Sequence, residues 1–169
     1  RGGACMDECR VRREMSNGEL QLPVAYLTCN FNAPIGDKPA LFTHDEVVTL
    51  FHEFGHGIHH MLTKMRVAGV SGINGVPWDA VELPSQFLEN WCWEEDALNF
   101  ISGHYETGEP LPADLLERML AARDYQSAMQ MVRQLEFSLF DFLLHSEKGS
   151  TVDVQGVLDS VRDEVAVSV

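Results

Sequence analysis

Apolar residues recur every three or four positions between residues 43 and 65, which is the period of one helix face. They are Val47, Phe51, Phe54, Ile58, Met61, Leu62 and Met65. Thr43 and Glu46 have the spacing of a capping box, in which each side chain binds a free backbone N–H at the start of a helix. The pattern predicts a helix over residues 43–65 with one broad stripe facing the core.

The segments on either side of this helix have different patterns. Residues 23–31, PVAYLTCNF, are rich in β-branched and aromatic side chains and predict a strand, and Pro23 at its start favours a sheet edge. Residues 69–77, GVSGINGVP, contain three glycines and a proline and predict a flexible loop. A second helix is predicted over residues 79–93, with Pro84 near its first turn.

Helical patterning resumes over residues 113–147, in the segments 113–122 and 127–145. In the second segment the predicted buried side consists of Met131, Leu135, Leu139 and Phe142. Residues 148–169 alternate acidic and aliphatic positions and predict a weakly anchored helix. The pattern as a whole predicts a mainly α fold with a small β element, as a single partial domain over residues 1–169.

Composition narrows the choice of partner and compartment. At 169 residues and 45% hydrophobic, the chain has the length of one domain and enough apolar residues for a core. Its formal net charge of −14 disfavours nucleic acid and anionic membranes, which would repel it. No apolar run approaches the ~20 residues that span a bilayer. Arg1-Gly2-Gly3 has neither an initiating Met nor signal-peptide character, so we expect a piece of a longer chain.

The four cysteines, Cys5, Cys9, Cys29 and Cys92, form no C-x-x-C pair. Cys5 and Cys9 would face each other across one turn if they lay on a helix. We expect four reduced thiols, which fits a reducing compartment and a cytoplasmic protein.

The sequence HEFGH at residues 52–56 carries the most specific chemical signal. On a helix, His52 and His56 lie on one face and can bind one ion, while Glu53 is turned away from that face but can reach a metal-bound water. This is the H-E-x-x-H arrangement of zinc peptidases. Gly55 and Gly57 each cost ~1 kcal/mol in a helix relative to alanine, so a close approach by another backbone or by substrate is expected there.

A catalytic zinc ion has three protein ligands and one open position. The spacing of a third histidine found in metzincins is absent, because His59 and Leu62 occupy the positions where that pattern needs glycine and histidine. The carboxylates of Asp79, Glu82 and Glu89 are the rival third ligands, and chemistry alone leaves all three open.

The pairing of HEFGHGIHH with VELPSQFLENWCWE resembles the thimet oligopeptidase and oligopeptidase A family of zinc metallopeptidases. The segments RGGA, PVAYLTCNF, PALFTHDEV, SGHYETGEPLP and RQLEFSLFDF are also similar to the bacterial oligopeptidase A branch. The resemblance extends from residue 1 to about residue 147. It implies a fragment of a zincin-like catalytic domain.

The resemblance also implies roles for individual residues. The ligands of one Zn²⁺ ion fall on His52, His56 and Glu82, and the general base falls on Glu53. Glu89 is a candidate to orient a ligand imidazole; the alternative is a solvated helix glutamate. We expect Asp79 to be a helix N-cap.

A zinc metalloendopeptidase that cleaves internal bonds of short peptides is the activity implied. Family members are usually monomeric, whereas this segment is expected to self-associate through exposed apolar surface. The glycine- and tyrosine-rich segment that supplies oxyanion donors in the family is missing here, and we expect the donors to lie outside this chain. The isolated chain is therefore expected to bind zinc and to hydrolyse peptides poorly.

The remaining histidines and aromatic residues have simpler expected roles. We expect His104 and Tyr105 to pack in a loop and His44 to be exposed. Core or supporting positions, not ligand positions, are expected for His59, His60 and His145. Packing between the two ligand helices is expected for Phe87, Trp91 and Trp93.

Two other functions compete with this one. The chain could be a non-catalytic metal-binding or interaction module. That alternative would be excluded if the chain hydrolyses peptides and the Glu53→Gln variant keeps zinc but loses this activity. It could also be a metal-free helical domain with a chance motif, which stoichiometric zinc would exclude.

Overall fold

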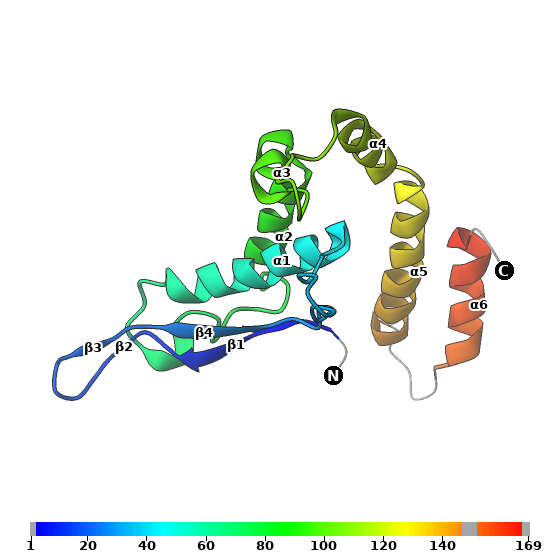
Figure 1. The fold of residues 1–169 in the computed structure, drawn as a ribbon. Helices are drawn as coiled ribbons and strands as arrows, with labels where there is room; N and C mark the ends of the chain where they lie inside the picture. The colour runs from blue at the N-terminus through cyan, green and yellow to red at the C-terminus, as the bar shows by residue number, and fades with distance from the viewer. Residues whose placement is uncertain (1–2, 147–151, 167–169) are drawn as a thin grey trace. The chain divides into compact units, whose positions relative to one another are not determined.

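The computed structural model describes residues 3–146 and 152–166 and divides into two compact units, residues 1–112 and 113–169. Within the described residues the fold is mainly helical, with two small antiparallel sheets of two strands each (Figure 1). The mainly α architecture with a small β element agrees with the prediction from the sequence.

The first unit begins with a long β-ribbon. Strand β1 (Cys5–Arg10) pairs antiparallel with β4 (Val24–Thr28), and the ribbon continues into β2 (Arg13–Glu14) and β3 (Leu20–Gln21). The predicted strand over 23–31 is thus found as β4, which pairs on one side only.

All four cysteines are free thiols, as expected. Because Cys5 and Cys9 lie on a strand, they do not face each other across a helical turn. Instead, the thiol of Cys9 donates to the hydroxyl oxygen of Tyr26 on β4, at 3.1 Å.

Helix α1 (His44–Met61) follows, and its predicted capping box is confirmed. The backbone N–H of Glu46 donates to the Thr43 hydroxyl at 3.3 Å, and that of Thr43 donates to the Glu46 carboxylate at 2.8 Å. The helix ends at Met61, four residues earlier than predicted.

The prediction of a core-facing apolar stripe on α1 is wrong in part: Val47, Phe51 and Ile58 are half-buried, and none of the stripe is fully buried. The buried residues are Glu53, Gly55, Gly57 and His60. Part of the stripe is exposed, namely Phe54, Met61, Leu62 and Met65. The ribbon and the next helix pack against the face of the helix with the smallest side chains, because only that face lets another backbone approach closely.

The ribbon lies against α1 in this first unit (Figure 1). A Cβ atom on Gly57 would be in ordinary contact with Leu27 Cδ2 of β4, at 3.6 Å. The His60 ring is fully buried, and its Nε2 donates to the main-chain oxygen of Arg10 in β1, at 2.8 Å. These contacts fix the orientation of α1 on the ribbon.

The glycine-rich loop contains a short 3-10 helix, η1 (Ala68–Val70), and is anchored at its middle. Ser71 is fully buried, and the N–H of Ile73 donates to His60 Nδ1 at 3.3 Å. Gly72 has φ +67° and lies directly against the His60 ring. His60 therefore joins α1, β1 and this loop, so the predicted flexibility does not extend to residues 71–73.

The second ligand segment is split into α2 (Leu83–Glu89) and a 3-10 helix, η2 (Asn90–Trp93), followed by α3 (Glu95–Ile101). Glu82 is the N-cap residue of α2, so the expectation that Asp79 caps this helix is wrong. Residues 78–82 form turns, which delay the start of the helix relative to the prediction.

Two of the three aromatic residues predicted between the ligand helices, Phe87 and Trp91, are exposed instead. Ser85 and Cys92 are the buried residues of this segment. His44 was expected to be exposed but is half-buried: its Nε2 contacts the main-chain oxygen of Cys92 at 2.7 Å, and its ring packs edge-on against Trp93 at 4.3 Å between centroids. One polar contact and one aromatic ring contact of His44 thus connect the start of α1 to η2.

The second unit contains α4 (Ala113–Arg123), α5 (Ser127–Ser146) and α6 (Val154–Val165). Helices α5 and α6 pack together, and Arg162 Nε contacts a Glu136 carboxylate oxygen at 2.9 Å. The predicted buried side of α5 is wrong for three positions, Met131, Leu135 and Phe142, which are exposed. The predicted tail helix is found as α6; residues 147–151 and 167–169 lie outside the described part of the chain.

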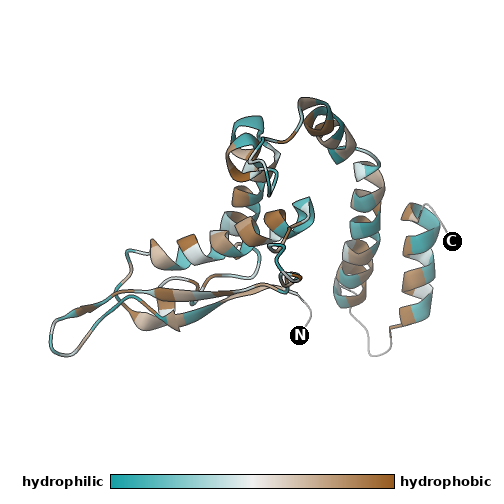
Figure 2. Ribbon diagram, in the orientation of Figure 1, coloured by the Kyte–Doolittle hydropathy of each residue, from teal (hydrophilic) through white to brown (hydrophobic). Residues whose placement is uncertain are grey.

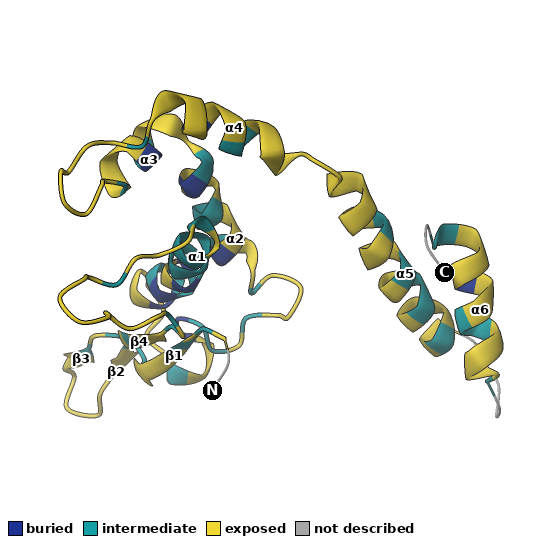
Figure 3. Cartoon of the chain, turned by 45° about the vertical axis from the view of Figure 1, so that its right-hand side comes forward, coloured by how far each residue is buried: buried dark blue, intermediate teal, exposed yellow. Residues whose placement is uncertain are grey.

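Few apolar side chains are buried among residues 3–146 and 152–166. They are Cys92, Leu98, Leu116 and Val161. Apolar residues instead lie at many exposed positions of the helices (Figures 2 and 3). In the described part of the chain no helix has both the length and the apolar character needed to cross a membrane.

Candidate metal centre

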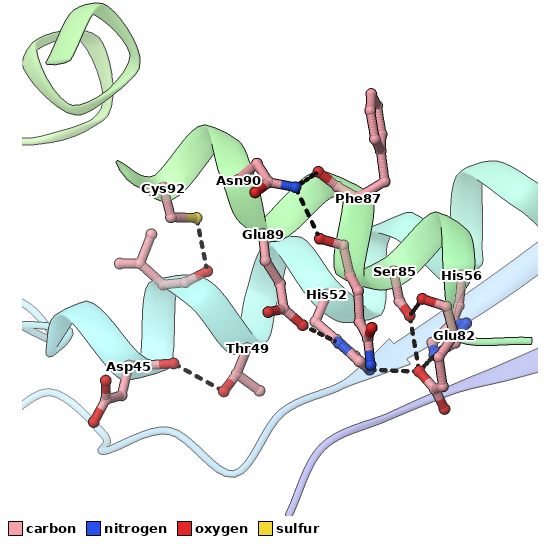
Figure 4. A network of polar contacts seen from close by, with 12 residues as sticks. Asp45, Thr49, His52, His56, Glu82, Ser85, Phe87, Glu89, Asn90 and Cys92 are labelled. Carbon is pink, nitrogen blue, oxygen red and sulfur yellow. Dashed lines mark hydrogen bonds and ion pairs between the residues drawn. The ribbon is translucent and has the colours of Figure 1, made fainter. Parts of the chain in front are cut away.

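The side chains of His52, His56 and Glu82 converge between α1 and the start of α2 (Figure 4). Oxygen Oε2 of Glu82 lies 3.2 Å from Nε2 of His52 and 3.2 Å from Nε2 of His56. The three donor atoms lie within 4.8 Å of one another, and they form the only such group among the described residues. Asp79 does not belong to it.

Gly55 explains how Glu82 can approach the two histidines. A Cβ atom at position 55 would lie 2.5 Å from Ser85 Cα and 2.6 Å from the main-chain oxygen of Pro84. Both distances are far below van der Waals contact, so the backbones of α1 and α2 meet at this glycine. The close approach that the helical glycines suggested is therefore made by the backbone of α2.

Glu82 is the N-cap residue of α2, but its side chain makes no capping hydrogen bond. Its carboxylate, about half exposed, accepts instead from the Ser85 hydroxyl at 2.8 Å. The carboxylate is thus directed toward the imidazoles and not toward the N-terminus of the helix.

Glu89 contacts the opposite nitrogen of the His52 ring. Its Oε1 lies 2.6 Å from Nδ1 of His52, one helical turn beyond Ser85 (Figure 4). A hydrogen on Nδ1 that is donated to this carboxylate leaves the lone pair of Nε2 facing Glu82. His52 thus lies between two carboxylates with a different nitrogen toward each.

The second imidazole, that of His56, has no such partner. Its Nδ1 is buried and has no hydrogen-bond partner within the described residues. Its Nε2, in contrast, faces Oε2 of Glu82. The polar contacts of His56 are therefore concentrated on the side where the three donor atoms meet.

Glu53 occupies the face of α1 that packs on the ribbon. It is 7% exposed, and its carboxylate has no hydrogen-bond or ion-pair partner among residues 3–146 and 152–166. Cys29, one residue beyond β4, is close to it: burial, and secondly the charge of Glu53, raise the pKa of the Cys29 thiol. A nearly buried carboxylate is thus within electrostatic range of the residue that follows β4.

The other histidines lie outside the cluster, as expected. His60 is a core residue with both nitrogens in hydrogen bonds. Burial, followed by His56 and His60, lowers the pKa of His59. His104 stacks on Tyr105 at 5.4 Å, and its Nδ1 accepts backbone N–H groups from the same loop. His145 is exposed on α5, so the expectation of a core or supporting position is wrong for this residue.

A sequence model of Peptidase family M3 matches residues 1–167. The chain belongs to this family. The resemblance to the oligopeptidase A family is thereby confirmed, and the family model covers all of the described residues, including those beyond residue 147.

Similar M3 proteins include oligopeptidase A of Escherichia coli, 72% identical over 147 residues, which are 87% of this chain and 22% of that protein. Oligopeptidase A of Haemophilus influenzae is 65% identical over 99% of this chain and 25% of its own length. An organellar oligopeptidase A of Arabidopsis thaliana is 49% identical over 87% of this chain and 19% of its own length. The chain spans a quarter or less of the length of these relatives.

Two contributors to this centre do not follow from the sequence patterns above. One is Ser85, for which the available signal is its spacing: residues three apart in a helical segment lie on one face and can contact each other. The partner of Gly55 was also not identified, because a glycine indicates a close approach without specifying what approaches.

Proposed function

We propose that this chain is the zinc-binding catalytic segment of a zincin-like metalloendopeptidase. In this proposal His52, His56 and Glu82 hold one Zn²⁺ ion, Glu53 is the general base, and Glu89 orients the His52 ring. The observation that carries it is the convergence of two Nε2 atoms on one carboxylate oxygen, at 3.2 Å each.

The donor set suits zinc. Histidine nitrogens and carboxylate oxygens bind Zn²⁺ at about 2.0–2.2 Å, so two ligands at a tetrahedral angle lie about 3.3 Å apart. The two contacts of Glu82 Oε2 are close to this separation. Two histidines and one glutamate are also a donor set of catalytic zinc sites, which keep one position open. The membership in Peptidase family M3 supports the same assignment.

When bound, a zinc ion supplies Lewis-acid chemistry, polarising a carbonyl and making water more acidic. The residues of the chain supply the proton transfers. Glu53, whose carboxylate has no competing hydrogen bond in the described residues, takes a proton from the attacking water and returns it to the leaving amine. Glu89 holds the His52 ring so that Nε2, and not Nδ1, faces the site.

Short peptides are the proposed substrates, and the relatives named oligopeptidase A support this choice. Strand β4 pairs only with β1, so its other edge can accept an extended peptide by β-strand addition. The charge of Glu53 acts on Cys29, one residue beyond this strand, which supports a peptide path that leads toward Glu53. We also propose a cytoplasmic location, which the free thiols support.

Robust hydrolysis requires oxyanion donors besides this centre. The nearest His–Tyr pair, His104 and Tyr105, is occupied within its own loop: Nδ1 of His104 accepts backbone N–H groups, and the Tyr105 hydroxyl donates to Glu106 at 2.7 Å. We propose that the donors come from outside residues 1–169, so that the isolated chain binds zinc but turns over peptides poorly.

The proposed zinc site is tested by measuring the zinc content of the chain after purification without added metal. One ion per chain is expected for the wild-type protein and for Glu53→Gln, and clearly less for His52→Ala and Glu82→Ala. A wild-type chain that takes up no stoichiometric zinc would falsify the proposal.

A chimera tests the catalytic part in a complete enzyme. The 147 residues of this chain that align with Escherichia coli oligopeptidase A, at 72% identity, replace their counterparts in that enzyme. The chimera should hydrolyse a fluorogenic peptide, whereas the same chimera with Glu53→Gln should retain zinc and lose at least about 10²-fold in kcat. Equal activity of the two chimeras would exclude Glu53 as the base.

A further inference from the structure

Ser85 places a buried hydroxyl against the carboxylate of Glu82. The side chain of Ser85 is fully buried, and its Oγ lies 2.8 Å from Glu82 Oε2 and 2.9 Å from the main-chain oxygen of Glu82 (Figure 4). Oε2 is the same oxygen that faces both imidazoles. One carboxylate oxygen is therefore shared between Ser85 and the two histidines.

The single hydrogen of the hydroxyl has two acceptors within reach. The main-chain oxygen of Glu82 already accepts the N–H of Gln86 at 3.0 Å, within the first turn of α2. The carboxylate oxygen carries charge and is the stronger acceptor. The hydrogen is therefore directed at Oε2, and this oxygen keeps a second lone pair for a cation.

The backbone of Ser85 is also the point where α2 touches α1. Ser85 Cα faces Gly55, which lies between His52 and His56 in the sequence. The position of the hydroxyl is thus fixed relative to the helix that carries both imidazoles. A carboxylate that accepts a hydrogen bond from this hydroxyl is therefore also held in a fixed position relative to α1.

We propose that Ser85 is a positioning residue for the metal centre: its hydroxyl holds Glu82 Oε2 at the point where it meets His52 and His56. This inference rests on the proposed zinc site. Glu82 needs such support because its side chain is half exposed and makes no capping bond. Among the described residues, Ser85 is the one hydrogen-bond donor to its carboxylate, whose other polar contacts are with the two imidazoles.

The test is a double-mutant cycle on zinc affinity, measured by competition with a chromophoric chelator. The proteins are the wild type, Ser85→Ala, Glu82→Ala and the double variant. Ser85→Ala should weaken zinc binding about 10- to 100-fold, the usual effect of removing a group that supports a ligand. In the Glu82→Ala background the same change should have less than a twofold effect, because the hydroxyl acts through that carboxylate.

Two further variants separate positioning from a general effect on folding. Ser138→Ala is the matched control, since the Ser138 hydroxyl donates only to the main-chain oxygen of Gln134 in α5, at 2.8 Å, and zinc affinity should be unchanged. Ser85→Thr keeps a hydroxyl and should bind zinc more tightly than Ser85→Ala. The absorption spectrum of the Co²⁺-substituted proteins should change for Ser85→Ala and not for Ser138→Ala.

The inference is overturned if Ser85→Ala binds zinc within twofold of the wild type, or if the same loss persists in the Glu82→Ala background. These outcomes differ from failure of the zinc site itself. If the proposed zinc site is wrong, the wild-type chain will not bind one zinc ion, or the Glu82→Ala variant will bind zinc as tightly as the wild type.

Discussion

A Cβ atom on Gly55 would lie 2.5 Å from the Cα atom of Ser85, so α1 and α2 touch through their backbones at this pair. His52 and His56 lie on α1 on either side of Gly55, and Glu82 lies three residues before Ser85. The distance between the candidate ligands is thus set by the absence of one side chain.

This contact predicts opposite results for two glycines of the same helix. Gly55→Ala should lower the free energy of unfolding by about 1–3 kcal/mol, the usual cost of overpacking, and should weaken zinc binding. Gly57→Ala should be neutral or stabilising by up to ~1 kcal/mol, because its Cβ would make only an ordinary contact with Leu27 at 3.6 Å. Urea denaturation and chelator competition measure both effects. Equal losses in the two variants would contradict the assignment.

The contact between Glu89 and His52 predicts a selective loss of metal affinity. Glu89→Ala should weaken zinc binding about 10- to 100-fold, because the His52 ring loses the acceptor that orients it. Glu94→Ala is the matched control: it precedes α3, is exposed and makes no capping bond, and its removal should leave zinc affinity unchanged. Isothermal titration with a competing chelator distinguishes the two.

The contact between Gly72 and the buried His60 ring predicts a strong effect in the glycine-rich loop. Gly72→Ala should destabilise the fold by about 2–4 kcal/mol, because a Cβ atom would overlap the ring and the left-handed φ of +67° disfavours alanine. Gly69→Ala has open space around the new atom and should change stability by less than about 0.5 kcal/mol. Equal melting temperatures of Gly72→Ala and Gly69→Ala would contradict this prediction.

The thiols should differ in reactivity. Cys5 and Cys9 are exposed, whereas burial, and secondly the charge of Glu89, raise the pKa of Cys92 to about 11. At pH 8 an alkylating reagent should modify Cys5 and Cys9 first and Cys92 last, as followed by mass spectrometry. Rapid modification of Cys92 in the native protein would contradict its burial.

The raised pKa of Cys92 also links stability to pH. The folded state holds the thiol proton more tightly than the unfolded state, whose thiol pKa is near 9.0. The contribution to stability is therefore fully present below about pH 9 and is lost as pH rises toward 11. Comparing wild type with Cys92→Ala by urea denaturation across this range isolates the effect.

Local sequence rules predicted the parts of the structure that depend on local interactions. The capping box at Thr43 formed as expected because its two hydrogen bonds involve residues three apart. The i, i+4 spacing brought His52 and His56 onto one face of α1 for the same reason. Glu82 was singled out only by the resemblance, because chemistry left Asp79 and Glu89 equally possible.

Burial could not be predicted in the same way. Periodicity identified the apolar side of α1, but the ribbon and α2 pack where side chains are small, at Gly55 and Gly57. Phe54 and Met61 remain exposed. Hydrophobic spacing reports which side chains would gain from burial, whereas tertiary packing depends on which backbones can approach one another.

The position of Glu82 relative to the helix that bears the two imidazoles has a thermodynamic consequence. An ion bound to all three side chains would tie together segments separated by the whole glycine-rich loop and so restrict the denatured chain, much as a disulfide does. Apo and holo forms would then differ in melting temperature, and the availability of the ion would influence how long a newly made chain survives proteolysis.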